Sequence, residues 1–85
     1  MVISFTPGAW DDYQYWANTD RKKLARINEL IKEIHRDPFQ GVGKPEPLKH
    51  GLAGCWSRRI DDMHRIVYKV DAEGVVIILQ LRYHY

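Results

Sequence analysis

The chain has 85 residues, 45% of them hydrophobic, and a formal net charge of only +2, which allows one domain around a small core and excludes a fully disordered chain. No apolar run approaches the ~20 residues of a membrane span, and the first residues lack the basic start and long apolar stretch of a signal peptide. The single Cys55 excludes an internal disulfide, and no Cys/His cluster has metal-ligand spacing, so we expect a cytoplasmic protein that needs neither metal nor cofactor.

A short strand and two helices are predicted for the first half of the chain. Residues 2–5 (VISF) form the strand, and Thr6-Pro7 supplies an N-cap followed by proline at the first helical position. Helical spacing then predicts one buried face with four members, Trp10, Tyr13, Trp16 and Ala17. A base-stacking surface is the alternative for these rings, but core packing is favoured. The segment Asn18-Thr19-Asp20 breaks this helix and caps a second, amphipathic one, which Pro38 ends.

A long irregular connection, residues 39–54 (FQGVGKPEPLKHGLAG), precedes the last strands. Connections of this length are usually functional or disordered, and the prolines on both sides of Glu46 argue against disorder. Three strands with short turns follow, at residues 55–60, 64–70 and 75–85. Short turns make neighbouring strands antiparallel. The order β-α-α-β-β-β predicts an α+β fold, in which an antiparallel four-stranded sheet packs on two N-terminal helices as one domain over residues 1–85.

The last hairpin is predicted to set which residues share a face, because side chains alternate along a strand. If Val70 pairs with Val75, Arg65 lies opposite Gln80 on the face away from the helices. The other face is the expected core, with Ile66, Tyr68 and Val70 beside Val75, Ile77, Leu79 and Leu81. From Gln80 to His84 is roughly 13 Å along an ideal strand, so His84 needs a twist or bend to approach Arg65.

The preceding hairpin is predicted to bring two arginines together. A three-residue turn that pairs Ile60 with His64 places Arg59 opposite Arg65, whereas a slip of one residue places Arg58 there instead. Two adjacent arginines repel each other unless an anion lies between them or nearby carboxylates, such as those of Asp61 and Asp62, neutralise them. The basic balance of residues 44–69 favours a polyanion as ligand, although a solvated face explains such charge equally simply.

These residue types can support RNA cleavage without a metal, by attack of the 2′-hydroxyl on the adjacent phosphorus. The reaction needs a base, an acid for the departing 5′-oxygen and cations for the phosphorane, and Glu46, His84 and the arginines can fill these roles. Tyr83 or Tyr85 is an alternative base, and a surface pairing of Glu46 with Lys44 or Lys49 is the structural alternative. The other histidines are interpreted as surface residues: His35, His50 and His64.

Several motifs in register closely resemble the YoeB toxins, a family within the RelE superfamily of type II toxin–antitoxin systems. They are GKPEPLKH, WSRR, HRIVY and the terminal RYHY, after WDDYQYW and INELIKEIHRDPF. The resemblance runs from about Trp10 to Tyr85, and Cys55 departs from it where an aromatic residue is usual. It implies a microbial-RNase-like fold and a ribosome-dependent mRNA endonuclease. The implied partners are a YefM-type antitoxin, a second copy of the toxin, and operator DNA only through the antitoxin complex.

By the same motifs, Glu46 is implied to be the general base, Arg65 to stabilise the phosphorane and His84 to be the general acid. Lys49 and Arg59 are implied to add positive charge that binds RNA phosphates, and Tyr85 to complete the site. A competing hypothesis is a non-catalytic module that grips RNA or acts as corepressor with its antitoxin. Such a module needs the arginines but neither Glu46 nor His84. A purely structural interaction domain is a third hypothesis.

Overall fold

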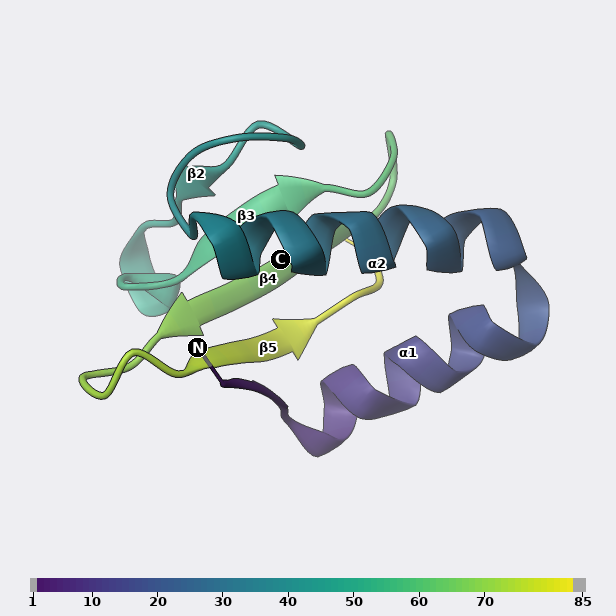
Figure 1. Cartoon of the computed structure of the whole chain (residues 1–85), viewed down its shortest axis with the longest axis horizontal. Coiled ribbons are helices and arrows are strands. Elements are labelled where there is room, and N and C mark those ends of the chain that lie inside the picture. Colours follow the sequence, from purple (N-terminus) through teal and green to yellow (C-terminus); the bar gives the residue numbers. More distant parts are fainter. Residues whose placement is uncertain (1, 84–85) are drawn as a thin grey trace.

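The protein is described by a computed structural model over residues 2–83. Its elements are β1 (Ile3–Phe5), α1 (Pro7–Thr19), α2 (Arg21–Arg36), β2 (Glu46–Pro47), a 3-10 helix at His50–Leu52, β3 (Trp56–Arg59), β4 (Arg65–Val70) and β5 (Val76–Gln80) (Figure 1). The strands form one five-stranded sheet in the order β1-β5-β4-β3-β2. The predicted α+β class and the pair of N-terminal helices are therefore confirmed.

The sheet differs from the predicted antiparallel four-stranded one in two ways. β1 runs parallel to β5, and β2 adds a fifth strand inside the long connection. The two-residue β2 pairs Glu46 with Ser57 at the edge of the sheet. Proline has no N–H to donate to the hydrogen bonds of a sheet and is therefore confined to such edges. The prolines on both sides of Glu46 thus argued against a strand in the sequence, and only the pairing with β3 identifies one.

Local side-chain signals set where both helices begin. The Thr6 hydroxyl accepts a hydrogen bond from the amide of Ala9 over 3.1 Å, and the Asp20 carboxylate accepts from the amides of Lys22 and Lys23. Each cap satisfies amides that have no partner inside the helix. Both predicted caps are confirmed.

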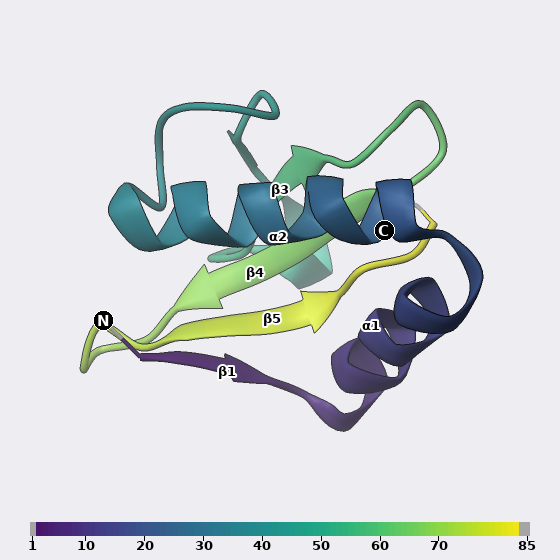
Figure 2. The same ribbon diagram turned by 45° about the vertical axis from the view of Figure 1, so that its right-hand side comes forward.

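Helix α2 lies across one face of the sheet (Figures 1 and 2). One hydrophobic cluster joins residues of both helices to the sheet. Ile27, Leu30 and Ile34 of α2 are completely buried there, and Trp16 is the buried aromatic residue of α1. The prediction that Trp10 is buried is wrong, because half of its surface is exposed. Its ring stacks on that of Tyr13 at the edge of the core. Within residues 2–83, neither helix is long and apolar enough to cross a membrane.

The hairpin between β3 and β4 has the predicted register. Arg59 lies opposite Arg65, and the amide of Ile60 donates to the carbonyl of His64 over 3.0 Å. The Asp61 carboxylate closes the turn by accepting from the amides of Met63 and His64. The predicted pairing of two arginines across neighbouring strands is therefore confirmed.

The hairpin between β4 and β5 has a different register from the predicted one. Val70 pairs with Val76 rather than Val75, and an irregularity between Val67 and Tyr68 shifts the pairing once more. The turn sets the first shift, because the amide of Asp71 bonds to the carbonyl of Val75 and closes a longer loop.

The two shifts have a consequence for the end of the chain. Ile78 lies in the core and Leu79 packs on the other sheet face, so the predicted faces of these two residues are wrong. Leu81 lies in the core as predicted. The amide of Arg65 bonds to the carbonyl of Tyr83 over 3.1 Å, so the prediction that Arg65 faces Gln80 is wrong. The chain thus reaches the Arg65 position without the extended separation that an ideal strand implies.

Candidate active site

The carboxylate of Glu46 and the guanidinium of Arg65 form an ion pair, with 3.2 Å between Oε1 and Nη1. Glu46 comes from the edge strand β2, and Arg65 begins β4, so strand β3 lies between them in the sheet. Glu46 is half exposed and Arg65 is mostly shielded. The fold therefore brings together the predicted base and the predicted phosphorane-binding cation, at a place that solvent and a ligand can reach.

Ser57 lies beneath this pair on the strand between its two elements. Its side chain is buried, Glu46 is its partner in β2, and Arg65 Nη1 lies 3.5 Å from its hydroxyl oxygen. A buried hydroxyl next to a guanidinium restricts where that side chain can turn. Sequence reasoning passed over Ser57, and only the pairing of β2 with β3 reveals it.

Lys49 is exposed and lies along a hollow of about 470 Å³ that the segment 46–52 lines. His50 begins the 3-10 helix there with a backbone φ of +59°. Left-handed backbone is uncommon for residues with a side chain. The segment therefore turns sharply after Lys49 and leaves Glu46 and Lys49 on the rim of one hollow.

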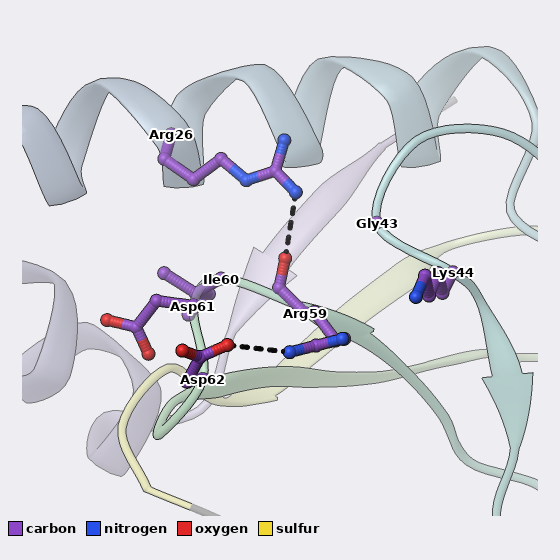
Figure 3. Close-up of a pocket in the computed structure, with 7 residues that line it drawn as sticks. All are labelled: Arg26, Gly43, Lys44, Arg59, Ile60, Asp61 and Asp62. Atoms are coloured by element: carbon purple, nitrogen blue, oxygen red, sulfur yellow. Dashed lines mark hydrogen bonds and ion pairs between the residues drawn. The ribbon is translucent and has the colours of Figure 1, made fainter.

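Arg59 lies opposite Arg65 in the backbone register, yet its guanidinium has a different neighbour. Its Nη2 is 2.8 Å from Oδ1 of Asp62, in a second hollow on the α2 side of β3 (Figure 3). The structural alternative, in which a carboxylate of the turn neutralises an arginine, is thus confirmed for Arg59 and Asp62. An RNA phosphate that binds Arg59 has to compete with this carboxylate.

The remaining two predicted site residues, His84 and Tyr85, lie outside the described residues. The segment before them is held closely. Trp16 Nε1 donates to the carbonyl of Leu81 over 2.9 Å, and the Asp12 carboxylate accepts from the Leu81 amide over 3.0 Å. The amide of Tyr83 donates to Nδ1 of His64 over 2.7 Å. The chain is therefore fixed up to the residue that precedes His84.

Arg58 supports the connection that leads to Glu46. It is completely buried, and its guanidinium donates to the hydroxyl of Tyr68 and to three backbone carbonyls, those of Asp37, Gln40 and Val42. The Tyr68 hydroxyl in turn donates to the carbonyl of Pro38. Burial raises the pKa of Tyr68, and the hydrogen bond from Arg58 only partly offsets this. Sequence reasoning treated Arg58 as one more basic residue, because nothing in WSRR distinguishes a buried arginine from an exposed one.

The chemistry that this site allows follows from the Glu46–Arg65 pair. A carboxylate can accept a proton, and a guanidinium presents several N–H donors to an anion. Within residues 2–83, no cluster of three or more His, Cys, Asp or Glu side chains could hold a metal ion. The described groups thus combine a proton acceptor with an anion-binding donor.

Comparison with known proteins gives one consistent family. The model for the YoeB-like toxin of the bacterial type II toxin-antitoxin system matches residues 5–85. Toxin YoeB of Streptomyces coelicolor is 61% identical over 85 residues, which is the whole of both chains. Two solved structures from Staphylococcus aureus cover all of this chain and 98% of the other. They are a YoeB dimer, with 45% identity and a TM-score of 0.91, and a YoeB–YefM complex, with 44% identity and a TM-score of 0.90.

Proposed function

The chain belongs to the YoeB-like toxins of bacterial type II toxin–antitoxin systems, and from this premise we propose that it is a ribosome-dependent endoribonuclease. It cleaves mRNA in the ribosomal A site and thereby inhibits translation. The observation that carries the proposal is the pairing of Glu46 with Arg65 over 3.2 Å. A proton acceptor and a phosphate-binding donor within one contact are what attack by a 2′-hydroxyl requires.

Each step of the proposed reaction assigns one group. Glu46 takes the proton of the 2′-hydroxyl while the 2′-oxygen forms a bond to the adjacent phosphorus. Negative charge then grows on the non-bridging oxygens, and Arg65 stabilises it through its N–H groups. The bond from phosphorus to the 5′-oxygen breaks, and His84 gives that oxygen a proton. The products are a 2′,3′-cyclic phosphate end and a 5′-hydroxyl end, and no metal takes part.

The ion pair also has a role before the substrate arrives. It holds the Glu46 carboxylate 3.2 Å from Arg65 Nη1, so the base and the phosphate-binding cation already lie together. When the scissile phosphate binds, it shares the guanidinium with Glu46, since the planar fork can serve two acceptors. Lys49 and Arg59 add positive charge for neighbouring phosphates, and Tyr85 completes the site next to His84.

The proposed biology follows from the family. We place the chain in the cytoplasm as a single domain over residues 1–85, where it acts on the ribosome and its mRNA. We also propose that a YefM-type antitoxin binds and inhibits it; for the binding, the support is that a relative forms a YoeB–YefM complex. A dimer is proposed because a relative forms one. Contact with operator DNA takes place only through the antitoxin complex.

A cleavage assay on programmed ribosomes tests the proposal. Purified protein is added to ribosomes that hold an end-labelled mRNA, and a second mRNA carries a 2′-deoxy substitution at the nucleotide that is cut. We expect cleavage of the first mRNA only, with a cyclic phosphate at the new end. Cleavage of the deoxy mRNA would exclude the 2′-hydroxyl as nucleophile. Folded protein that binds ribosomes and cuts neither mRNA would favour the non-catalytic module.

A further inference from the structure

A second hollow, of about 300 Å³, lies between α2 and the end of β3 (Figure 3). We call it the α2–β3 groove. Its charged lining consists of three cations and two carboxylates, Arg26, Lys44, Arg59, Asp61 and Asp62. Cations therefore outnumber carboxylates on its walls. Among residues 2–83, no aromatic ring lines it, so this part of the chain offers no surface there on which a base could stack.

Arg26 is fixed on the α2 wall of the groove. Its Nη2 donates to the carbonyl of Arg59 over 3.1 Å (Figure 3). Its Nη1 lies 3.4 Å from the carboxylate of Glu29. A guanidinium has five N–H groups, so donors remain after these two contacts. Because the bond to the Arg59 carbonyl joins helix to strand, a ligand meets this guanidinium already in place.

Lys44 is held on the other side of Arg59 by an unusual backbone (Figure 3). Gly43 and Lys44 have φ values of +91° and +54°, and the carbonyl of Gly43 accepts from the amide of Arg59 over 2.7 Å. A Cβ on Gly43 would lie 2.8 Å from a methyl group of Leu30, so only glycine fits there. A left-handed lysine is costly and persists only when its surroundings impose it. Here they place a cation on the groove wall.

The two carboxylates of the groove differ in how many interactions they make. Asp61 forms an ion pair with Lys23 and accepts from two turn amides. Burial alone would raise the pKa of Asp61, but the bonds from Lys23 and from those amides outweigh it and lower the pKa. Asp62 is fully exposed, and among the described residues its carboxylate pairs only with Arg59. An exposed ion pair of this kind is weak, so an external anion can replace Asp62.

We propose that the α2–β3 groove binds a phosphodiester of the RNA backbone and that Asp62 is the internal counterion which the RNA displaces from Arg59. The inference rests on the proposed function and extends it to two residues to which the family motifs give no role, Arg26 and Lys44. Its position fits, because Arg59 lies opposite Arg65 and Lys44 is two residues before Glu46. One arginine guanidinium can bind two phosphate oxygens at once through two parallel N–H groups. A strand that passes Glu46 can therefore continue into the groove.

Binding measurements with matched charge changes test this site. The probes are a single-stranded RNA oligonucleotide with 2′-O-methyl groups, which cannot be cut, and ribosomes without mRNA. Arg26→Gln and Lys44→Gln should each weaken binding and reduce the slope of log K against log salt by about 0.7 for the single strand. Lys32→Gln is the control, because it removes the same charge from an exposed position on α2 outside the groove.

Asp62→Asn gives the sharper test because its expected effect has the opposite sign. Removing the competing carboxylate should tighten RNA binding about two- to fivefold, which is the worth of an exposed ion pair. Glu73→Gln removes an equal charge at the exposed turn between β4 and β5 and should leave affinity nearly unchanged. Lys44→Gln and Asp62→Asn alter exposed side chains only, so they decide the matter even if Arg26→Gln unfolds.

The outcomes separate the two proposals. If the wild-type protein binds RNA while the Lys44 and Asp62 variants behave like their controls, the groove proposal is overturned and the proposed function stands. If the wild-type protein binds neither probe, the groove proposal fails, and the cleavage assay on programmed ribosomes decides the proposed function separately. Effects seen with the oligonucleotide assign the phosphodiester to the mRNA strand. Effects seen with ribosomes alone assign it to ribosomal RNA, and both results support the groove as a phosphodiester site.

Discussion

The amide of Tyr83 donates a hydrogen bond to Nδ1 of His64 over 2.7 Å, and the next residue along β4, Arg65, donates its own amide to the carbonyl of Tyr83 over 3.1 Å. His64 and Arg65 thus bind the backbone N–H and the backbone carbonyl of Tyr83, the residue before His84. Nδ1 must carry no proton to accept this bond. The prediction that His64 is merely a surface histidine is therefore wrong, since it anchors the chain beside the candidate site.

Replacing His64 tests this anchor. His64→Ala should slow single-turnover cleavage of ribosome-bound mRNA about two- to tenfold, because the loss of one hydrogen bond lets Tyr83 and the acid after it shift. His64→Asn should restore most of the rate, since its side-chain oxygen can accept from the Tyr83 amide. Both variants lose the ring contact with Trp16, so melting temperatures should fall alike. Equal rates for the two variants would reduce His64 to a packing residue.

Glu46 is expected to contribute to chemistry and not to binding. Glu46→Gln keeps the size of the side chain and a weaker bond to Arg65 but removes the base, so cleavage should fall by ~10²–10⁴-fold. Ribosome binding should stay close to that of the wild type. Lys49→Ala and Arg59→Ala should show the reverse pattern, with weaker and less salt-dependent binding. A Glu46→Gln variant that binds as poorly as Arg59→Ala would make the 46–52 segment structural and remove the assignment of a base.

Arg58 should be essential for stability although it is not assigned to catalysis. Arg58→Met leaves the Tyr68 hydroxyl and the carbonyls of Gln40 and Val42 without their buried donor. Hydrogen bonds to charged groups contribute about 1.5–3 kcal/mol each after the exchange with water is included, so the free energy of unfolding should fall by about 3 kcal/mol or more. Urea unfolding measures the loss. Arg36→Met, at an exposed position at the end of α2, is the control and should cost little.

The features that were predictable from sequence are those in which neighbouring residues decide the outcome. Thr6 and Asp20 cap helices through bonds to amides two or three residues away, and the turn that pairs Ile60 with His64 is equally local. Residue chemistry named Glu46 and Arg65 as candidates, but no local signal could predict their direct contact, because they are 19 residues apart.

The features that escaped prediction depend on distant contacts. The bulge between Val67 and Tyr68, together with the shifted turn, places Ile78 in the core, although it was predicted on the opposite face. The buried role of Arg58 depends on carbonyls 16–21 residues away. Neither feature leaves a local pattern in the sequence. A strand with a bulge has the same sequence pattern as a regular strand, and a buried arginine cannot be told from an exposed one.

Acid should destabilise the protein partly through Asp61. The folded protein lowers the pKa of this carboxyl, so the carboxylate contributes stability that is present above the unfolded-state pKa and is lost as the pH falls through the folded-state pKa. Asp61→Asn keeps an oxygen for the turn amides but loses the ion pair with Lys23. The unfolding free energy of this variant should be lower than that of the wild type at neutral pH, and it should change less as the pH falls. Asp62→Asn, measured beside it by urea unfolding, should retain the wild-type acid dependence.

Stepwise truncation separates the catalytic end of the chain from its structural part. Removal of residues 84–85 leaves the described bonds of Leu81 to Trp16 and Asp12, and of Tyr83 to His64, so the melting temperature should change only slightly. Cleavage should still fall by ~10²–10⁴-fold, since the proposed acid is lost.

Removal of residues 81–85 should have a different effect, because Leu81 is completely buried and its loss leaves a cavity under α1. Truncating a buried leucine to alanine alone costs about 2–5 kcal/mol, which is a large part of the stability of a small domain. Melting curves and single-turnover cleavage on both truncations give the comparison. A folded protein that lacks residues 84–85 and still cuts at the wild-type rate would show that His84 is not the acid. Unfolding of the shorter deletion would instead show that the final two residues stabilise the sheet, which contradicts their assignment to catalysis alone.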